Sequence, residues 1–386
     1  MTGHDTDNLH PNSLAAQDKE AEHTVAADLK EWAVRASQES GRSPLQMKKE
    51  FVQNERWPGQ MSILEYLQQR LYELGKRERK EFLSEWLHWP IHDIVNDPEF
   101  SKKCHDKWMC TSVLSDLGLA TIPISVVVDP ASGDYGETLV ASTAAELTDF
   151  LATAEFPLFA KPNDLLGSFG AFRIESFDGE RVLLHNGDSW TVDVLIEEVM
   201  SAIPYVLQPV ISNHDQIRQF AEGLATIRVV NFVEDSGVRI ERAVLKIPVA
   251  GQVADNAWRE GNLTANINPE TGVIDRVISG LGPDLVEYDE HPATGTQLVG
   301  MALPMWDELR ALDIATAKAF SGLSYQTQDI ALSNDGPLVV EVNSGGSFAL
   351  PQAASGRGLL TDENKRFFER CGVNFRTMQN PRLAAA

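Results

Sequence analysis

Apolar and polar positions alternate with two different periods along this chain, and the change of period divides it into regions. Between residues 24 and 96, apolar side chains recur at helical spacing, as Leu64, Leu67 and Leu71 do, and prolines and glycines interrupt the pattern. We therefore predict a helical N-terminal region whose leucine and tryptophan side chains pack together. The residues before it lack hydrophobic periodicity and are expected to form a disordered tail.

Beyond residue 100, short apolar runs suited to strands alternate with helical segments. A helix is expected at 106–117 and a buried strand at 121–129, and the alternation continues to residue 154. Three further strands are expected between residues 157 and 200, the last of them the apolar stretch 191–200. This order of elements predicts a mixed α/β (α+β) fold.

Strands dominate the remainder of the chain, with one helix expected near residues 305–321. No internal repeat or low-complexity linker is evident. The predicted organisation is a disordered tail at 1–24, a helical N-terminal region at 25–100, a first α/β lobe at 101–200, and a second, larger lobe with C-terminal helices at 201–386.

Residues 324–346 predict a β-hairpin near the end of the chain. Two short apolar runs flank the Asn-Asp-Gly sequence at 334–336, and these residue types tolerate the tight backbone of a hairpin loop. We expect Ser333 to face Pro337, which fixes how the remaining residues of the two strands pair.

The expected pairing places Ile330 opposite Val340 on one, apolar face. Asp329 lies opposite Glu341 on the other face, and Asn343 joins them because strand side chains alternate with period two. Two carboxylates about 5 Å apart repel by roughly 3 kcal/mol at an effective dielectric near 20, so something must compensate. Two carboxylates and an amide oxygen form the hard oxygen set that Mg²⁺ prefers. Either the hairpin binds Mg²⁺ here or its polar face is simply solvated.

Composition narrows the range of functions. A formal charge of −23 over 386 residues argues against nucleic acid or an anionic membrane surface as a partner, because both require a basic footprint. No apolar run approaches the roughly 20 residues of a membrane span. The polar N-terminus lacks the features of a signal peptide, so we expect a cytoplasmic protein. The three cysteines show neither disulfide nor zinc spacing.

Lys161 ends an apolar strand and precedes a short glycine loop, Gly167-Ser168-Phe169-Gly170. Glycine lets the backbone approach a phosphate closely, and successive N–H groups can hold an anion with the lysine as a point charge. The spacing is not that of a Walker loop and does not complete G-x-G-x-x-G. The motif therefore indicates either a phosphate-binding loop or a plain hairpin with an exposed lysine.

The paired acids Glu197 and Glu198 lie beside the apolar residues Ile196, Val199 and Met200. A flat purine needs apolar walls and backbone donors and acceptors, and a strand that leaves a sheet offers both. The alternative is a core strand with two solvated glutamates.

Arg228 and Lys246 each lie within an otherwise apolar strand. Burying an unpaired cation is costly, so each side chain must either reach solvent or meet an anion. Two such residues on adjacent strands of so acidic a protein are candidates for phosphate or carboxylate binding.

In chain order, the lysine strand, glycine loop, paired glutamates, arginine strand, lysine strand and Asp…Glu-x-Asn hairpin resemble the ATP-grasp superfamily. More narrowly, the chain is similar to the sugar-transfer-associated ATP-grasp proteins over nearly its whole length beyond the tail. The segments that carry this closer similarity are SPLQMKKEF, ILEYLQQRLY, DKWMCTSVLSDLGLATIP, FAKP with GSFG, ATIRVVNF, ADNAWREGNLTANINPETGVI, HPATGTQLVGMALPMWDEL and DIALSNDGPLVVEVNSGG.

The resemblance implies an ATP-grasp fold, in which two α/β lobes clamp ATP behind a helical N-terminal region. It also implies roles for particular residues. They are Lys107 and Lys161 on the phosphates beneath the loop Gly167 to Gly170, Glu197 to Met200 around adenine, Asp329, Glu341 and Asn343 on Mg²⁺, and Arg228 and Lys246 facing the transferred phosphate.

The chain departs from the family's usual pattern at several positions. Lys246 stands where arginine is common, and lysine lacks the bidentate fork. The usual double glycine is Gly261-Asn262 here, and the Gly-Trp before the first metal aspartate is Thr327-Gln328. No ribose-binding carboxylate is evident at 201–206. These departures concern the substrate more than the ATP site.

The activity that the resemblance implies is that of a carboxylate–amine ligase, which forms an amide bond through an acyl phosphate and releases ADP and phosphate. Its expected partners are a small-molecule carboxylate and an amine, in bacterial polysaccharide or small-molecule biosynthesis. Two alternatives stay open: a phosphotransferase acting on a sugar-like hydroxyl, and a module that binds nucleotide without turnover. The sequence does not indicate an oligomeric state.

Overall fold

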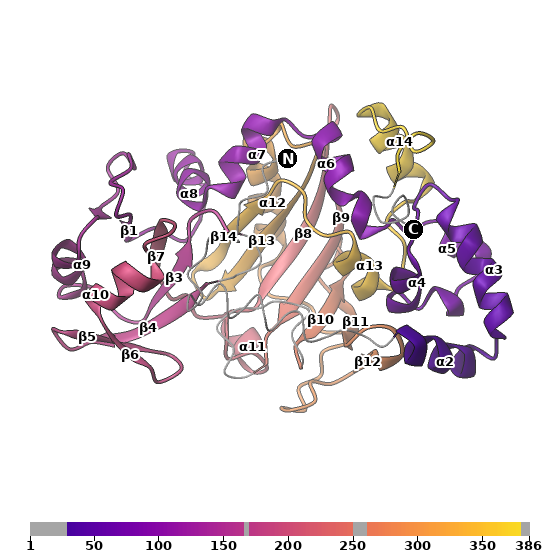
Figure 1. Cartoon of the computed structure of the whole chain (residues 1–386), viewed down its shortest axis with the longest axis horizontal. Coiled ribbons are helices and arrows are strands. Elements are labelled where there is room, and N and C mark those ends of the chain that lie inside the picture. Colours follow the sequence, from indigo (N-terminus) through magenta and orange to yellow (C-terminus); the bar gives the residue numbers. More distant parts are fainter. Residues whose placement is uncertain (1–28, 166–169, 250–260, 380–386) are drawn as a thin grey trace.

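The structure is a computed structural model that describes residues 29–165, 170–249 and 261–379. Two seven-stranded sheets form separate lobes; helices α2 to α5 lie on the side of the larger lobe away from the smaller one, and α7 and α8 lie beside β14 (Figure 1). This arrangement confirms the predicted α/β class with a helical N-terminal region. Within the described ranges, no helix is both long and apolar enough to cross a lipid bilayer.

The N-terminal region buries its own small core, as predicted. Leu67 and Leu71 are fully buried in a cluster with Trp32, whereas Trp86 and Trp89 stay largely exposed. The helices are α2 (Leu29–Ser40), α3 (Pro44–Glu55), α4 (Ile63–Gln68), η2 (Leu71–Glu73), α5 (Lys76–Arg79), η3 (Glu85–Leu87), α6 (His88–Val95), α7 (Pro98–His105) and α8 (Lys107–Asp116).

The smaller lobe contains a sheet with the strand order β2-β1-β7-β3-β4-β5-β6. All its neighbouring strands run antiparallel except β1 and β2. The elements are β1 (Val126–Val128), β2 (Val140–Ala141), α9 (Ala144–Leu151), β3 (Leu158–Pro162), β4 (Phe172–Phe177), β5 (Arg181–Leu184), β6 (Ser189–Thr191) and β7 (Tyr205–Pro209).

The strand predicted at 191–200 is wrong. Residues Val192–Val194 form the short helix α10, which continues as one π-helical turn, η4 (Leu195–Val199). The buried residues Val192, Leu195 and Val199 are spaced as on one face of a helix. A short apolar run of this kind also suits a strand, so the apolar run alone did not distinguish the two. The sheet instead contains β7, between β1 and β3, and this strand lies beyond the lobe boundary predicted at residue 200.

The larger lobe contains a sheet with the strand order β12-β11-β10-β9-β8-β13-β14. Its elements are α11 (Asp215–Arg218), β8 (Thr226–Glu234), β9 (Gly237–Ile247), β10 (Leu263–Ile267), β11 (Ile274–Ser279), η5 (Gly282–Asp284), β12 (Val286–Glu287), α12 (Trp306–Ala319), β13 (Tyr325–Ser333), β14 (Gly336–Asn343), α13 (Ala349–Ser355) and α14 (Asp362–Arg370).

The two faces of this sheet differ in chemistry. One face is apolar, with residues such as Val229, Leu245 and Ile330 packed in a large core beneath α12. The opposite face is apolar where Phe232 and Tyr325 pack against α6 and α14 and where Val244 packs against α13. The rest of that second face carries charged side chains, and it is the face on which the candidate site lies.

The hairpin of β13 and β14 forms as predicted, but its turn is one residue tighter. Ser333 pairs with Gly336 rather than Pro337, and Ile330 pairs with Val339 rather than Val340. A bulge between Asp329 and Ile330 then shifts the register by one residue.

The bulge restores the predicted pairing at the charged end of the hairpin. Beyond it, Asp329 lies directly opposite Glu341, as expected. The tight turn and the bulge offset each other, so the carboxylates share a face although the pairing near the turn was predicted wrongly.

The N-terminal region is joined to the larger lobe by a buried amide. The side chain of Gln352, which is 1% exposed, accepts hydrogen bonds from the Leu83 and Leu359 amides at 2.8 and 3.0 Å and donates to the Leu83 carbonyl at 2.9 Å. Three backbone groups from two distant segments therefore depend on one side chain.

We predict that Gln352→Ala lowers the free energy of unfolding by about 2–4 kcal/mol, because it leaves buried backbone groups without partners. Denaturant unfolding measures the change. Gln53→Ala, at an exposed position of α3, is the matched control and should change stability by less than about 0.5 kcal/mol. Equal stability of the two variants would show that the Gln352 bonds do not hold the region in place.

Candidate functional site

Antiparallel pairing brings the predicted charged residues of the larger lobe onto one face. Arg228 in β8 lies opposite Asp329 in β13, which in turn lies opposite Glu341 in β14. Arg228 also faces Val244, two residues from Lys246 in β9, so Lys246 shares the same face. Four neighbouring strands therefore contribute one charged residue each.

Asp329 is the centre of this group. Arg228 grips it with two hydrogen bonds, from Nε to Oδ1 at 2.9 Å and from a terminal nitrogen to Oδ2 at 2.7 Å. Lys246 Nζ donates to Oδ2 at 3.1 Å. Although burial opposes ionisation, the two cations hold the pKa of Asp329 well below its usual range. Asp329 is therefore a carboxylate at neutral pH and is the partner of both cations.

Glu341 and Asn343 occupy the same face of β14 but are less constrained. Glu341 is partly buried and has no ion pair or hydrogen bond among the described residues. Asn343, two residues further on, has its Nδ2 atom buried without a hydrogen-bond partner. Both side chains thus keep polar atoms available for a ligand.

Two lysines from the other lobe approach these acids. Lys161 lies on β3, and Lys107 is the first residue of α8, with Nζ 2.6 Å from the Leu165 carbonyl oxygen. Burial lowers the pKa of both lysines, that of Lys161 to about 8, and the charge of Lys107 lowers it further. Glu341 acts on both lysines in the opposite direction. The lobes thus bring cations and carboxylates within electrostatic range.

A loop residue fixes where α8 begins. The side-chain oxygen of Asn163 accepts from the Trp108 amide at 2.8 Å, and its carbonyl accepts from the Lys107 amide at 2.9 Å. Asn163 follows β3 directly, so it ties Lys107 to the strand that carries Lys161. Sequence reasoning missed this contact, because nothing local links an asparagine to a helix more than fifty residues earlier.

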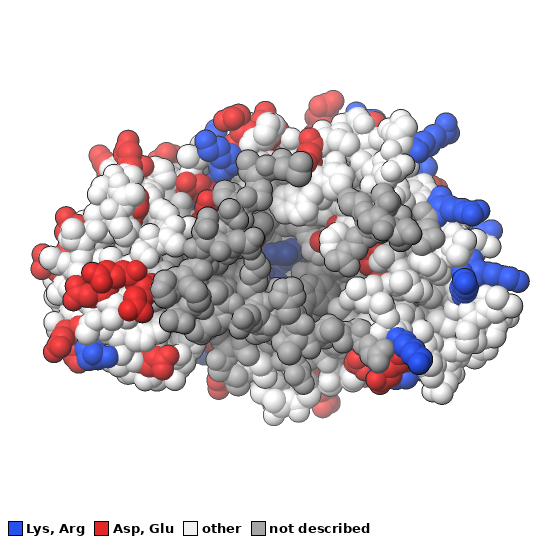
Figure 2. All heavy atoms as spheres, in the orientation of Figure 1, with Lys and Arg blue, Asp and Glu red and all other residues white. Residues whose placement is uncertain are grey.

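The molecular surface is hollowed near the middle of the face shown in Figure 2, and basic side chains are visible on the floor of the hollow. Acidic side chains gather at the left and along the top of this view, and basic side chains lie along its right. A local positive charge inside an acidic protein is the arrangement that a small anionic ligand requires.

The predicted adenine segment does not join this group. Glu197 and Glu198 are exposed, and Val199 and Met200 are buried in the core of the smaller lobe. The helix α10, which leads into them, lies on the outer side of that lobe (Figure 1). The prediction assumed a strand that leaves the sheet, and residues 195–199 form a helical turn instead.

The strand that does leave the smaller sheet is β7. It runs between β1 and β3, and the chain passes from its end to α11 of the larger lobe. The backbone of residues 208–212 therefore leaves the sheet, as the adenine prediction required of its segment. The apolar pattern of 205–211 was visible in the sequence, but it did not indicate which of two apolar runs forms the exit strand.

Most of the predicted glycine loop, Gly167, Ser168 and Phe169, lies outside the described residues. Gly170, which follows, has a φ of +71° and accepts a hydrogen bond from the Tyr205 hydroxyl at 3.2 Å. Glycine is suited to that left-handed backbone conformation.

The chain directly after Asn343 is held by the N-terminal helices. The Ser344 hydroxyl lies 2.9 Å from His92 Nε2 and 3.1 Å from His105 Nε2. The Asn96 side chain binds the Ser344 carbonyl. Sequence reasoning missed this clamp, for which the only local indication was the clustering of histidines in 88–105.

Close approach also explains the glycine after Ser344. A Cβ atom on Gly345 would lie 2.3 Å from Nε2 of His88. His88 is buried, Nε2 has no hydrogen-bond partner, and burial lowers the pKa of its imidazole to about 3. The neutral imidazole of His88 therefore packs directly against the backbone of Gly345 and holds the chain in place just after the predicted metal ligands.

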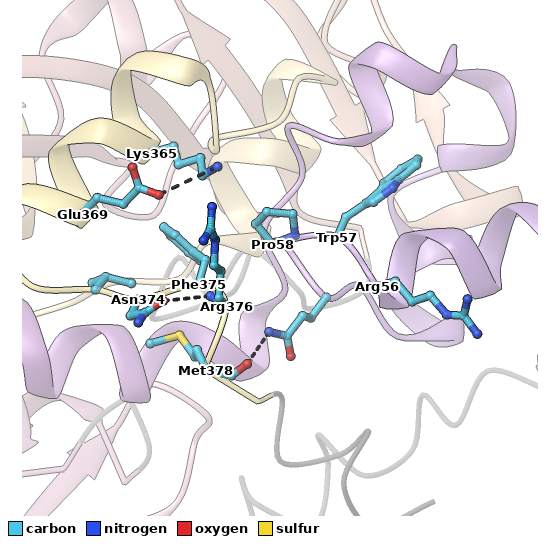
Figure 3. A pocket seen from close by; sticks show the side chains of 11 residues that line it. Arg56, Trp57, Pro58, Lys365, Glu369, Asn374, Phe375, Arg376 and Met378 are labelled. Carbon is cyan, nitrogen blue, oxygen red and sulfur yellow. Dashed lines mark hydrogen bonds and ion pairs between the residues drawn. The ribbon is translucent and has the colours of Figure 1, made fainter.

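A separate cavity of about 790 Å³ lies elsewhere, between the N-terminal helices and the segment after α14 (Figure 3). Figure 3 shows Trp57 and Pro58 on one side and Phe375 and Arg376 on the other. None of the predicted site residues lines it, so its size does not make it the candidate site.

The residues present fit the divalent cation that the family resemblance implies. Two carboxylates and an amide share one face, and their oxygens are the hard ligands that such an ion prefers. Within the described ranges, no cluster of three His, Cys, Asp or Glu side chains could hold a metal ion, so the predicted set depends on the Asn343 amide oxygen as its third ligand.

The family model described as "Sugar-transfer associated ATP-grasp" matches residues 92–366, which is more than half of the chain. No curated protein sequence matches.

Solved structures of ligases and synthetases are similar at low identity. D-alanine–D-alanine ligase from Bacillus anthracis is 16% identical, with 72% of this chain and 70% of that chain covered and a TM-score of 0.40. An ADP complex of N5-carboxyaminoimidazole ribonucleotide synthetase is 10% identical, with 64% and 46% covered and a TM-score of 0.38. L-amino acid ligase from Bacillus licheniformis is 12% identical, with 66% and 43% covered and a TM-score of 0.36. At these values no substrate or reaction follows for this chain.

We predict that the affinity of the protein for ATP falls as the pH rises through about 8, by up to tenfold per pH unit, because Lys161 loses its charge there. Lys161→Arg should remove this dependence, since a guanidinium stays charged throughout, and Lys161→Ala should weaken binding at every pH. Calorimetric titration between pH 7 and pH 9.5 measures it.

The matched control is Lys102→Arg, at an exposed position of α7, which should retain the wild-type profile. A wild-type affinity that does not change between pH 7 and pH 9.5 would remove Lys161 from the nucleotide site.

Proposed function

The chain belongs to the sugar-transfer-associated ATP-grasp family, and from this premise we propose that it is an ATP-dependent ligase that joins a small-molecule carboxylate to an amine. The amide forms through an acyl phosphate, with release of ADP and phosphate. We further propose that it acts in the cytoplasm, in polysaccharide or small-molecule biosynthesis.

One observation carries the proposal. Lysines of the first lobe approach the charged face of the second lobe. There burial lowers the pKa of both Lys107 and Lys161, and the carboxylate of Glu341 opposes this shift. Activation of a carboxylate by ATP needs this mixture of cations and carboxylates, because phosphoryl transfer depends mainly on positioning and on neutralising charge. Neither lobe has the set alone.

In the first step, a carboxylate oxygen of the acid substrate attacks the γ-phosphorus of ATP. The bond from that phosphorus to the β–γ bridging oxygen breaks, and ADP leaves with its electron pair. Arg228 and Lys246 neutralise the charge that spreads over the transferred phosphoryl group, and Lys107 and Lys161 hold the remaining phosphates. Asp329, Glu341 and Asn343 would hold Mg²⁺, which would supply further positive charge to neutralise the phosphates.

Arg228 and Lys246 already share the charge of Asp329. Their positive ends are therefore held in place before substrate binds, so little reorganisation accompanies the reaction. Lys246 supplies a point charge, whereas the guanidinium of Arg228 can donate two parallel hydrogen bonds.

In the second step, the amine nitrogen attacks the acyl carbon and phosphate leaves, while the nitrogen loses a proton to solvent or to the departing phosphate. The backbone of residues 208–212, where the chain crosses between lobes, is the segment that we propose for the adenine base in place of Glu197 to Met200.

We predict that phosphate release requires both an acid and an amine. Incubation with Mg·ATP and panels of acids and amines, with colorimetric detection of free phosphate and mass spectrometry of the products, tests this. A phosphorylated hydroxyl compound without free phosphate would instead establish a phosphotransferase. Tight ATP binding without ADP formation for any acceptor would establish a binding module.

We predict different outcomes for the two paired carboxylates. Glu341→Gln should abolish turnover, by at least about 100-fold, while the free energy of unfolding changes by less than about 1 kcal/mol, because Glu341 has no ion pair among the described residues. Asp329→Asn should abolish turnover and also lower stability by about 3–5 kcal/mol, because it removes the buried carboxylate charge to which both Arg228 and Lys246 donate.

Steady-state kinetics at several Mg²⁺ concentrations and denaturant unfolding give both quantities. Undiminished activity of Glu341→Gln at ordinary Mg²⁺ would rule out Glu341 as a metal ligand. Unchanged stability of Asp329→Asn would contradict the role of Asp329 as the partner of Arg228 and Lys246.

A further inference from the structure

A polar island lies within the main apolar core, on the face of the larger sheet opposite the candidate site. Helix α12 contributes Asp313 and Thr316, and the strands beneath it contribute Asn231, Gln326 and Gln328. All five side chains are 0% exposed. Polar groups that are buried this deeply normally have hydrogen-bond partners.

Each amide nitrogen of the island donates at least one hydrogen bond, and this fixes the orientation of each amide. Gln328 Nε2 donates to the Asp313 carbonyl at 3.0 Å, and Asn231 Nδ2 donates to Asp313 Oδ1 at 2.7 Å. Gln326 Nε2 donates to three carbonyls at the end of α12 and just beyond it. Reversing any of these amides would place oxygen against oxygen.

The oxygen ends of the same side chains have no partners. One carboxylate oxygen, three amide oxygens and one hydroxyl oxygen are buried without a hydrogen bond: Asp313 Oδ2, Asn231 Oδ1, Gln326 Oε1, Gln328 Oε1 and Thr316 Oγ1. Asn231 and Gln326 are direct cross-strand partners, and Gln328 is two residues along β13 on the same face. The strand residues that carry unpartnered atoms therefore lie next to one another on the face that packs against α12.

The island has more acceptors than donors. Its remaining side-chain donors are the Thr316 hydroxyl and the second N–H groups of Asn231 and Gln328, whereas its five unpartnered atoms are all oxygens. Asp313 forms no ion pair among the described residues, and Arg310, the one cation that acts on it, pairs with Glu270 at 3.4 Å. Burial raises the pKa of Asp313 to about 7, so ionised Asp313 needs a compensating charge near neutral pH.

We propose that this island binds one dehydrated monovalent cation, Na⁺ or K⁺, with Asp313 Oδ2 as its charged ligand and the neighbouring amide and hydroxyl oxygens as its neutral ligands. Hard cations prefer oxygen ligands of these types. A single carboxylate balances a single positive charge, whereas a divalent ion would leave one uncompensated charge in the core.

The site would act on structure rather than on the reaction. It ties α12 to β8 and β13, the strands that carry Arg228 and Asp329 on their other face. Cation binding to the folded state alone stabilises that state by mass action. The inference does not depend on the proposed ligase activity, and its test needs no substrate.

Thermal unfolding of the full chain at constant ionic strength and pH 8, with choline chloride replaced stepwise by NaCl or KCl, tests the proposal. The expected result is a saturable rise of the unfolding midpoint by at least about 2 °C with one of the two ions. Asp313→Asn should abolish the rise. Asp307→Asn, at an exposed position of the same helix, should retain it.

The same midpoint in choline, sodium and potassium for the wild-type protein would overturn the proposal, and buried water or a proton on Asp313 would then satisfy the island. A second measurement covers the case in which Asp313→Asn does not fold. Crystals of the wild-type protein soaked in RbCl or thallium acetate should show an anomalous peak within about 3 Å of Asp313 Oδ2. The absence of any peak there would also overturn the proposal.

Discussion

The ion pairs of Arg228 and Lys246 with Asp329 are the interactions on which the rest of the site depends. They join β8, β9 and β13 across one face of a sheet whose other face is packed against α12. Isolated in such a strand, each of these charges would carry a large desolvation cost, and together they compensate one another. The group therefore keeps two cations charged and oriented beside Glu341, which has no ion pair of its own among the described residues. Phosphate oxygens and a cation could bind beside this group while Arg228 and Lys246 keep their hydrogen bonds to Asp329.

The second constraint is that the complete set exists only where the lobes meet. Lys161 and Lys107 belong to the first lobe and its flanking helix, and Asn163 ties the one to the other. Their burial depresses their pKa values, and Glu341 of the second lobe opposes that shift at both lysines. The electrostatic balance of the site is thus set by the approach of the two lobes. The clustering of basic groups also explains how so acidic a protein can offer a site to a polyanion.

The N-terminal helices contribute to the site indirectly. They clamp Ser344 through two histidines and an asparagine, and they place His88 against the bare backbone of Gly345. The Gln352 side chain then joins the same helices to α13. The chain that leaves the predicted metal ligands is therefore fixed from outside the second lobe. This gives the helical region a physical role, which is to position the end of β14.

The sequence by itself determined the features that depend on local periodicity. Alternation within β14 placed Glu341 and Asn343 on one face, and helical spacing was enough to predict the N-terminal core around Leu67 and Leu71, whereas Asp329 lies opposite Glu341 only because the bulge offsets the tighter turn. Tertiary structure decided whatever depends on contacts between distant segments. The apolar residues at 192–199 suit a helix or a strand equally, and only their packing in the first lobe selected the helix and left β7 as the exit strand. The bulge beside Asp329, the pairing of Asp329 with Arg228 and the docking of Lys107 on Asn163 likewise follow from which strands and helices become neighbours, and the spacing of residues along a chain does not carry that information.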